Sequence, residues 1–304
     1  MKTQESIENH NLRENSMDFT IVDVFAERPF EGNQLAVVRT DMDLTQEEMM
    51  SVTREFGFSE TTFIKRNDPV NLPVPVRIFG LNGEMKFAGH PSIGTSSVIA
   101  KGKNINSLTL QLGIGNIRVN IENSEGRQIF EMEQGDPQFM EIHSKEDVAE
   151  ALGINAGIID PELTVETVST GNPFVIVPIR NLKDIAALKI SKDRSWEYLK
   201  QHGAMHFYLV SKETVSPSAK LHARMIYEMG EDPATGSAAG PAAAYMIKHG
   251  ILKSRNHGWI EQGIEMGRPS IMRVTGQING EYIGNVKVAG RCFQIADGKL
   301  SLPY

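Results

Sequence analysis

Short runs of alternating apolar and polar residues dominate the chain and predict a protein rich in β-strands. The alternation is clearest in VPVRIFG (74–80) and SLTLQL (107–112). The same criteria predict strands at 19–25, 34–39, 60–66, 74–80, 107–112, 117–121 and 127–133 in the first half, and at 163–169, 173–179, 205–210, 221–229, 259–266, 270–276, 282–289 and 292–296 in the second.

Five helices interrupt these strands. A helix over 45–56 is indicated by Thr45 as a cap and by apolar residues at helical spacing. The next follows FAGHP, with Pro91 suited to the first helical position and Gly102 to the end. The others are predicted at 144–153, near 191–201 and in the alanine-rich segment after DPATGS.

The regular pattern breaks around 134–144, and the length of 304 residues favours two domains. We therefore expect an N-terminal domain over 18–135 and a C-terminal domain over 143–285. Residues 1–17 are polar and predict a disordered extension.

Both halves contain a strand that leads into a helix opening with small residues, AGHPSIGTSS in the first and PATGSAAGPAAA in the second. Amides in the first turn of a helix have no partner within it and carry partial positive charge. Two such helix starts facing one cleft would bind a carboxylate. The alternative is that small residues only allow tight packing of helix on sheet, but the repetition of the pattern favours a ligand site.

Composition narrows the class of protein. Hydrophobic residues make up 40% of the chain and charged residues 23%, as in ordinary globular proteins, and one cysteine excludes a disulfide scaffold. A net charge of −7 argues against a nucleic-acid-binding protein. There is no apolar stretch long enough to span a membrane and no signal-peptide pattern, so we expect a soluble cytoplasmic protein.

Two residues of the first half are candidates for acid–base chemistry. Glu60 lies between Phe58 and Phe63, where apolar surroundings would raise a carboxyl pKa. His90 precedes Pro91 at a helix start, where the helix dipole would keep the imidazole neutral. The alternatives are a solvated carboxylate at a strand start and a structural histidine at a cap.

In the second half, Asp232 and Ser237 belong to EDPATGSAAG. The structural alternative is that Ser237 or Thr235 caps the helix while Asp232 braces the turn. A capping hydroxyl at a cleft can also face a ligand, so the two readings are compatible.

Other chemistries find little support. His202 and His206 are four residues apart, but Gly203 separates them and no carboxylate set accompanies them in sequence. The glycine pair at 113 and 115 lacks the rest of a dinucleotide fingerprint, and GxSxG is absent. Cys292 is expected to be a small core residue. We therefore expect no metal and no organic cofactor.

Taken in order, the segments DVFAERPFEGNQLAVV, FSETTFI, FAGHPSIGT, STGNPFVIV, EDPATGSAAG and QGIEMGRPS resemble the PhzF-type phenazine-biosynthesis isomerase family, which has a diaminopimelate-epimerase-like fold. The resemblance covers nearly all of residues 18–296. It implies an α/β protein of two pseudo-symmetric domains, each a curved mixed sheet around a central helix, with the active site in the cleft between them. It also implies that strands 286–304 complete the first domain and that the protein is a homodimer.

The same resemblance implies roles for individual residues. Glu60 would be the proton shuttle, and His90, Asp232 and Ser237 would line the same pocket. Gly89 and Gly236 would present amides to a substrate carboxylate, and Asn33 would line the cleft. The chain departs from the family at Gln34, where a proline is usual, and at Gly80-Leu81, where Thr-Pro is usual.

These features predict an isomerase that shifts a proton on a small unsaturated cyclic or amino carboxylic acid, similar to trans-2,3-dihydro-3-hydroxyanthranilate isomerase. A racemase with two catalytic cysteines is excluded by the single cysteine. A cysteine-independent epimerase or racemase, and a non-catalytic protein that binds small acids, are the alternatives.

Overall fold

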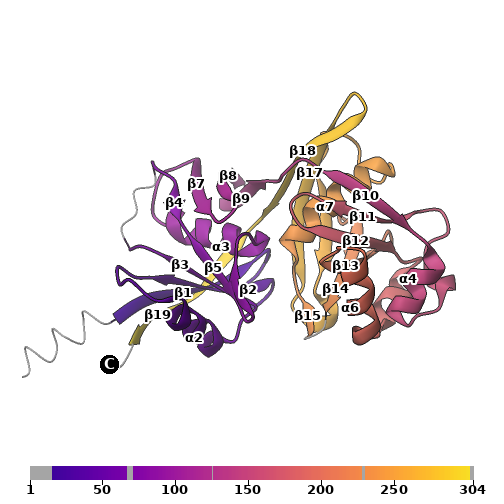
Figure 1. Cartoon of the computed structure of the whole chain (residues 1–304). Helices are drawn as coiled ribbons and strands as arrows, with labels where there is room; N and C mark the ends of the chain where they lie inside the picture. The colour runs from indigo at the N-terminus through magenta and orange to yellow at the C-terminus, as the bar shows by residue number, and fades with distance from the viewer. Residues whose placement is uncertain (1–15, 67–70, 125, 228–229, 302–304) are drawn as a thin grey trace, which may run out of the picture.

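The computed structural model describes residues 16–66, 71–124, 126–227 and 230–301. The chain forms two lobes, and the last strands run from the second lobe back to the first (Figure 1). Two mixed sheets make up most of the structure, as the alternating pattern predicts. In the described part of the chain, no helix is both long and apolar enough to cross a membrane.

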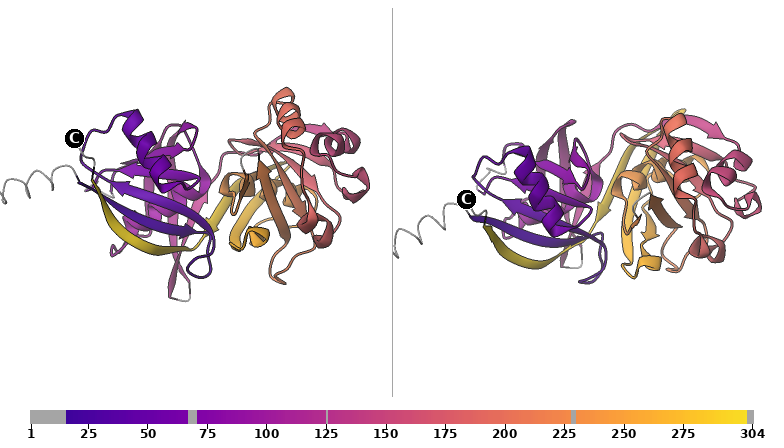
Figure 2. Two further views of the ribbon diagram at one scale, coloured as in Figure 1. Left: turned by 90° about the horizontal axis from the view of Figure 1, so that it is seen from below. Right: turned by 60° about the horizontal axis from the view of Figure 1, so that its bottom comes forward.

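The first sheet lies in the first lobe and has the strand order β19-β1-β2-β3-β5-β6. β19 is antiparallel to β1 along its whole length, so the C-terminal strand lies beside the N-terminal one (Figure 2). The strands are β1 (Ser16–Val24), β2 (Asn33–Arg39), β3 (Glu60–Ile64), β5 (Arg77–Gly80), β6 (Gly83–Met85) and β19 (Cys292–Ser301).

The start of β1 corrects one expectation. The strand begins at Ser16, and Met17 is fully buried, so these two residues belong to the fold and not to a disordered extension. Met17 packs in the core cluster that also contains Val38 and Phe79. Residues 1–15 of the predicted extension lie outside the described residues.

The second sheet passes through both lobes in the order β10-β11-β12-β13-β14-β16-β17-β18-β9-β8-β7-β4, with β15 paired to β14. Pairing of β18 with β9 joins the halves. Its strands are β4 (Val74–Pro75), β7 (Ser107–Leu112), β8 (Gly115–Ser124), β9 (Arg127–Glu133), β10 (Gln138–His143), β11 (Val165–Ser169), β12 (Pro173–Pro178), β13 (His206–Ser211), β14 (Leu221–Tyr227), β15 (Gly230–Asp232), β16 (Gly258–Gln262), β17 (Ser270–Asn279) and β18 (Tyr282–Gly290).

Two sequence-based assignments change in this sheet. The segment 134–144 is not only a break in the pattern, because it contains β10 at the sheet edge. The strand predicted at 259–266 ends at Gln262, where Gly263 has a φ of 77° and a short 3₁₀ turn, Ile264–Met266, follows. The last two residues of the strand predicted at 221–229 lie outside the described residues.

A nearly fully buried helix lies at the centre of each lobe. α3 (Gly89–Ala100) packs against β1, β2 and β3, and α7 (Gly236–Lys248) packs against β11, β17 and β18. Almost every residue of both helices is buried, including Ser92, Thr95 and Ser96 of α3, so neither helix has a solvent-exposed face. Small side chains permit this: a Cβ at Gly94 would stand 2.6 Å from Leu35 Cδ2.

The other helices lie at the periphery. α2 (Gln46–Phe56) begins with the predicted cap, since Thr45 and Glu48 form a reciprocal capping box. α4 (Lys145–Leu152) and α6 (Lys192–Gln201) correspond to predicted helices, whereas α5 (Leu182–Ala187) and the 3₁₀ turn Ala156–Ile158 are too short for a periodic signal.

Candidate active site

The starts of α3 and α7 meet at the boundary between the lobes. A Cβ at Gly89 would stand 2.7 Å from the carbonyl carbon of Gly236 and 2.7 Å from the amide nitrogen of Ser237. A Cβ at Gly236 would stand 3.0 Å from the Phe25 ring. Both glycines therefore allow an approach that a side chain would block, and the sequence-based expectation that the two helix starts face each other describes this geometry.

Neither helix start receives a hydrogen bond from its N-cap side chain. Ala88 has no suitable group, and the Thr235 hydroxyl donates to Asp232 Oδ2 at 2.6 Å instead. Thr235 is the N-cap residue of α7, but its hydroxyl accepts from Gln262 and not from a first-turn amide, so the expectation that this side chain caps the helix is corrected. First-turn amides of both helices thus keep capacity for an anionic ligand.

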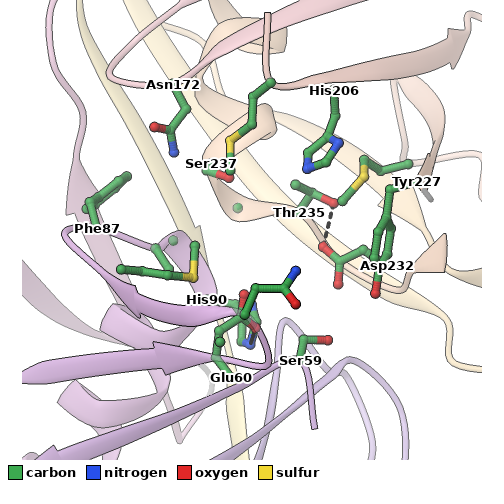
Figure 3. A pocket seen from close by; sticks show the side chains of 18 of the residues that line it. Ser59, Glu60, Phe87, His90, Asn172, His206, Tyr227, Asp232, Thr235 and Ser237 are labelled. Carbon is green, nitrogen blue, oxygen red and sulfur yellow. Dashed lines mark hydrogen bonds and ion pairs between the residues drawn. The ribbon is translucent and has the colours of Figure 1, made fainter. Parts of the chain in front are cut away.

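A cavity of about 360 Å³ opens beside these helix starts and receives side chains from both lobes (Figure 3). The first lobe contributes the start of β3, the β5–β6 turn and the start of α3. The second contributes the starts of β12 and β13, the end of β14 and the start of α7. Its lining comprises Ser59, Glu60, Gly80, Leu81, Asn82, Gly83, Glu84, Met85, Phe87, Ala88, Gly89, His90, Asn172, Phe174, Met205, His206, Met225, Tyr227, Asp232, Thr235, Gly236 and Ser237.

Glu60 is the first residue of β3, and its side chain is only 16% exposed. Burial raises its pKa to about 8, and the negative charge of Asp232 adds to the increase. The predicted direction is confirmed: an apolar setting favours the neutral carboxyl group. Such a pKa allows the group both to accept and to donate a proton near neutral pH.

His90 lies next to Glu60, with its Nε2 atom 3.3 Å from Glu60 Oε2. Burial lowers the pKa of His90 to about 3, against the opposing effect of a backbone hydrogen bond with Gln34. The imidazole is therefore neutral, as expected, but burial rather than the helix dipole is the leading cause. Neither His90 Nε2 nor Glu60 Oε2 has a hydrogen bond of good geometry among the described residues.

Asn33 connects the two lobes behind the cavity. Its amide nitrogen donates to Asp232 Oδ1 at 2.7 Å and to the Ala234 carbonyl at 3.0 Å, and lies 3.2 Å from His90 Nδ1. Asn33 is 2% exposed and is not among the lining residues, so the expectation that it lines the cleft is corrected. Asn33 instead contacts His90 and Asp232, which do line the cavity.

Asp232 is buried, and its pKa is raised to about 6, because burial outweighs the hydrogen bonds from Thr235 and Asn33. The Gln262 amide donates to the Asp232 carbonyl at 2.7 Å and to the Thr235 hydroxyl at 2.9 Å. Tyr208 in turn donates to Gln262 Oε1. This network fixes the turn before α7, and sequence reasoning missed Gln262 and Tyr208 because nothing local marks them.

Sequence reasoning also missed three polar side chains that line the cavity from the second lobe: Asn172, His206 and Tyr227. Burial lowers the pKa of His206 to about 4. Burial also raises the pKa of Tyr227, with further contributions from the charges of Asp232 and Glu60. Two of these residues lie at strand ends, and the STGN segment was the only available signal for Asn172.

A possible metal-binding cluster lies elsewhere. Among the described residues, Glu141, His143 and His202 bring ligand atoms within 4.8 Å of one another. The sequence alone did not bring Glu141 beside His202, because 61 positions separate them. These groups already have partners: His143 contacts the Tyr198 and Thr167 hydroxyls, and His202 Nδ1 lies 2.9 Å from Glu141 Oε2.

Cys292 lies on β19, away from the cavity, and is partly buried. Burial raises the pKa of its thiol to about 12, which leaves almost no reactive thiolate at neutral pH. It packs against the main core, in agreement with its predicted structural role.

Comparison with known proteins places this arrangement in a family. The family model described as phenazine biosynthesis-like protein (PhzC-PhzF) matches residues 22–298. An uncharacterized isomerase of Mesorhizobium japonicum is 31% identical, over 93% of this chain and 98% of the relative. Trans-2,3-dihydro-3-hydroxyanthranilate isomerase of Pseudomonas chlororaphis is 29% identical, over 93% of this chain and 99% of the relative.

Solved structures agree. A PhzF-family phenazine biosynthesis protein of Bacillus anthracis superposes with a TM-score of 0.85 at 26% identity, covering 94% of this chain and 99% of that one. A hydroxyproline epimerase of Agrobacterium vitis superposes with a TM-score of 0.62 at 11% identity, over 95% of this chain and 93% of that one, and this likeness concerns the fold alone. The chain therefore belongs to the PhzC-PhzF phenazine biosynthesis-like family and is an isomerase of that family.

Proposed function

We propose that this isomerase moves a proton between two carbons of a small unsaturated cyclic or amino carboxylic acid, without a cofactor and with Glu60 as the acid–base group. The observation that carries the proposal is a buried carboxyl group whose pKa is raised to about 8, at the wall of a cavity that both helix starts border. A carboxyl group with that pKa exchanges protons in both directions at low cost near neutral pH.

The proton transfer needs one residue only. The Glu60 carboxylate removes the allylic proton, the electron pair delocalises over the unsaturated system, and the protonated Glu60 returns the same proton to the distal carbon. No net proton or electron is gained or lost. Neutral His90, with Nε2 3.3 Å from Glu60 Oε2, is in position to orient the carboxyl group.

Binding would use both helix starts. Gly89 and Gly236, together with Ser237, would present amides and a hydroxyl to the substrate carboxylate, where positive helix ends stabilise negative charge. Asp232 would accept a hydrogen bond from a substrate amino group, since its two oxygens are already fixed by Asn33 and Thr235.

We further propose that the lobes are pseudo-symmetric halves, residues 18–135 and 143–285, with strands from 286 onward completing the first, that the substrate binds in the cleft between them, and that the protein is a homodimer. Support comes from the two buried helices with their adjoining starts and from the pairing of β19 with β1. Light scattering after size-exclusion chromatography tests the dimer, which a monomeric mass would overturn.

The experiment that tests the reaction is solvent-deuterium exchange followed by NMR, with trans-2,3-dihydro-3-hydroxyanthranilate first in a panel of unsaturated and amino acids. Isomerisation predicts a rearranged double bond, with any label at the carbon that receives the proton. Label with inversion at one carbon would support epimerisation instead. Binding without exchange of any compound would support a non-catalytic binding protein.

Glu60→Gln is the variant that decides the role of Glu60, because the amide keeps the shape but cannot accept the proton. It should abolish turnover and leave binding almost unchanged. Glu84→Gln is the matched control, since Glu84 borders the same cavity but pairs with Arg77. Full turnover by Glu60→Gln would show that another group transfers the proton.

A further inference from the structure

A second cavity, of about 380 Å³, adjoins the one that contains Glu60. Four residues line both cavities: Asn82, Met205, His206 and Tyr227. The two hollows are therefore neighbours that share a wall. None of the roles proposed above for the reaction or for carboxylate binding uses the second one.

The shared wall is the open end of the β13–β14 ladder. Leu209 pairs with Arg224 in this antiparallel ladder, and the same register places His206 opposite Tyr227 at its end. Their ring centroids are 5.9 Å apart. Figure 3 shows both side chains at the same border of the first cavity, across from Glu60.

Strand alternation explains why one ladder borders two cavities. Met225 and Tyr227 point to the face of β14 that lines the first cavity, and Ile226, between them, lines only the second. The cavities thus lie on opposite faces of the sheet and meet around its end, where the His206 and Tyr227 rings stand.

The second cavity is mainly apolar. Its lining beyond the shared wall includes Ile190, Trp196, Leu199, Phe207 and Ile226. Trp196 lies on α6, whose other exposed residues are polar, and it is 51% exposed. These residues give the second cavity an apolar lining, which is typical of small-molecule binding pockets.

The first lobe also reaches this place. Asn82 lies in the β5–β6 turn, directly after the Gly80-Leu81 pair that departs from the family pattern. Leu81 lines the first cavity, and Asn82 lines both. The departure therefore falls in the wall of the first cavity, directly beside Asn82, which both cavities share.

We propose that the second cavity binds an apolar substituent, an aryl or branched alkyl group, of the same acid whose carboxylate lies at the helix starts. The substrate would then pass over the His206–Tyr227 pair, with its reacting atoms at Glu60 and its apolar end against Trp196 and Leu199. This inference rests on the proposed carboxylate site, and it narrows the proposed substrate class to acids that carry an apolar substituent.

Calorimetric titration with three probes tests the inference: 2-aminobenzoate and its 4-phenyl and 5-phenyl derivatives. At least one phenyl derivative should bind about tenfold or more tightly than 2-aminobenzoate, because the added ring loses its contact with water. A lack of any gain, while 2-aminobenzoate still binds, would overturn this inference and leave the proposed reaction standing. Failure of all three to bind would overturn the carboxylate site as well.

Two variants locate the effect. Ala204→Phe fills the second cavity without touching the first, and should remove the gain from the phenyl group while leaving 2-aminobenzoate affinity unchanged. Trp196→Ala removes an aromatic side chain from the lining of the second cavity and should reduce the affinity gain from the phenyl group several-fold. Glu197→Ala, an exposed neighbour on the same helix, is the control that should change neither affinity.

Thermal unfolding of each variant shows whether it is folded. If Ala204→Phe does not fold, Trp196→Ala still tests the inference. Equal losses for the short and the phenyl probes in both variants would show that the second cavity is only structural. A change of oligomeric mass in Trp196→Ala, with probe affinities unchanged, would show that a second copy of the chain covers this surface instead.

Discussion

The raised pKa of Glu60 predicts how the stability of the protein depends on pH. In the folded state, burial and the charge of Asp232 raise the pKa from 4.5 to about 8. Between these values the folded state holds a proton that the unfolded state releases. The free energy of unfolding must therefore fall as pH rises, and the contribution is complete below pH 4.5 and lost above about pH 8.

The magnitude follows from the size of the shift. Each pH unit inside this window costs about 1.4 kcal/mol, since that is the free energy equivalent of one pKa unit. The difference in unfolding free energy between Glu60→Gln and the original protein should therefore change by about 4 kcal/mol between about pH 5 and about pH 9. Glutamine cannot ionise, so the variant becomes the relatively more stable protein as pH rises.

The assay is urea unfolding of both proteins at one-unit steps of pH, with the two curves subtracted so that all other titrations cancel. Glu84→Gln is a control of opposite sign, because its hydrogen bonds with Arg77 lower the pKa of Glu84 and its contribution is lost as pH falls. A difference between Glu60→Gln and the original protein that stays constant across the range would refute the assignment of a raised pKa.

Three further predictions, two of them with a control substitution, test the packing and charge of the fold by the same measurement. Gly89→Ala places a Cβ 2.7 Å from the backbone of the first turn of α7 and should cost about 1–3 kcal/mol. In the control Gly230→Ala the nearest atom to the new Cβ is the Tyr227 hydroxyl oxygen at 3.9 Å, so this variant should be nearly neutral. Arg224→Leu leaves Glu231, whose side chain is only 15% exposed, without its partner and should cost about 3–5 kcal/mol. Arg77→Leu breaks an exposed pair and should cost about 1 kcal/mol or less, and equal costs for the two variants would contradict this. His222 is desolvated, yet two glutamates raise its pKa from 6.5 to about 9, so the stability lost in His222→Gln should be largest below pH 6.5 and shrink as pH rises through 9.

The central features of the site could be predicted from sequence because their signals are local. A helix that starts with Gly-His-Pro or Gly-Ser-Ala-Ala has small residues and free amides wherever it is placed. In the same way, the position of Glu60 between two phenylalanines predicts a buried carboxyl group. For the helix starts the decisive residues lie within a few positions along the chain, whereas the neighbours of Glu60 at the cavity, His90 and Asp232, come from distant segments.

Other features depend on contacts that no local pattern encodes. Asn33 donates a hydrogen bond to Asp232 across the two lobes, 199 positions apart. From its sequence neighbours it could be predicted only as a residue that lines the cleft. Thr235 is the N-cap residue of α7, but its hydroxyl bonds to Asp232 and Gln262 instead of to a first-turn amide. His206 and Tyr227 come together at the cavity because the β13–β14 ladder pairs residues some twenty positions apart and ends there. Alternation predicts which face a residue takes, but not what lies opposite.

The charges at the site bear on which acids it can use. A substrate carboxylate would add a third negative group beside Glu60 and Asp232, and like charges raise a carboxyl pKa further. An ammonium group held by Asp232 would offset that charge and keep Glu60 able to ionise. We therefore expect cyclopentanecarboxylate to bind with more proton uptake at pH 8 than proline, which has a ring of similar shape but carries the cation. Calorimetry in buffers of different ionisation enthalpy measures this uptake, and equal uptake for both acids would show that Asp232 does not hold the amino group.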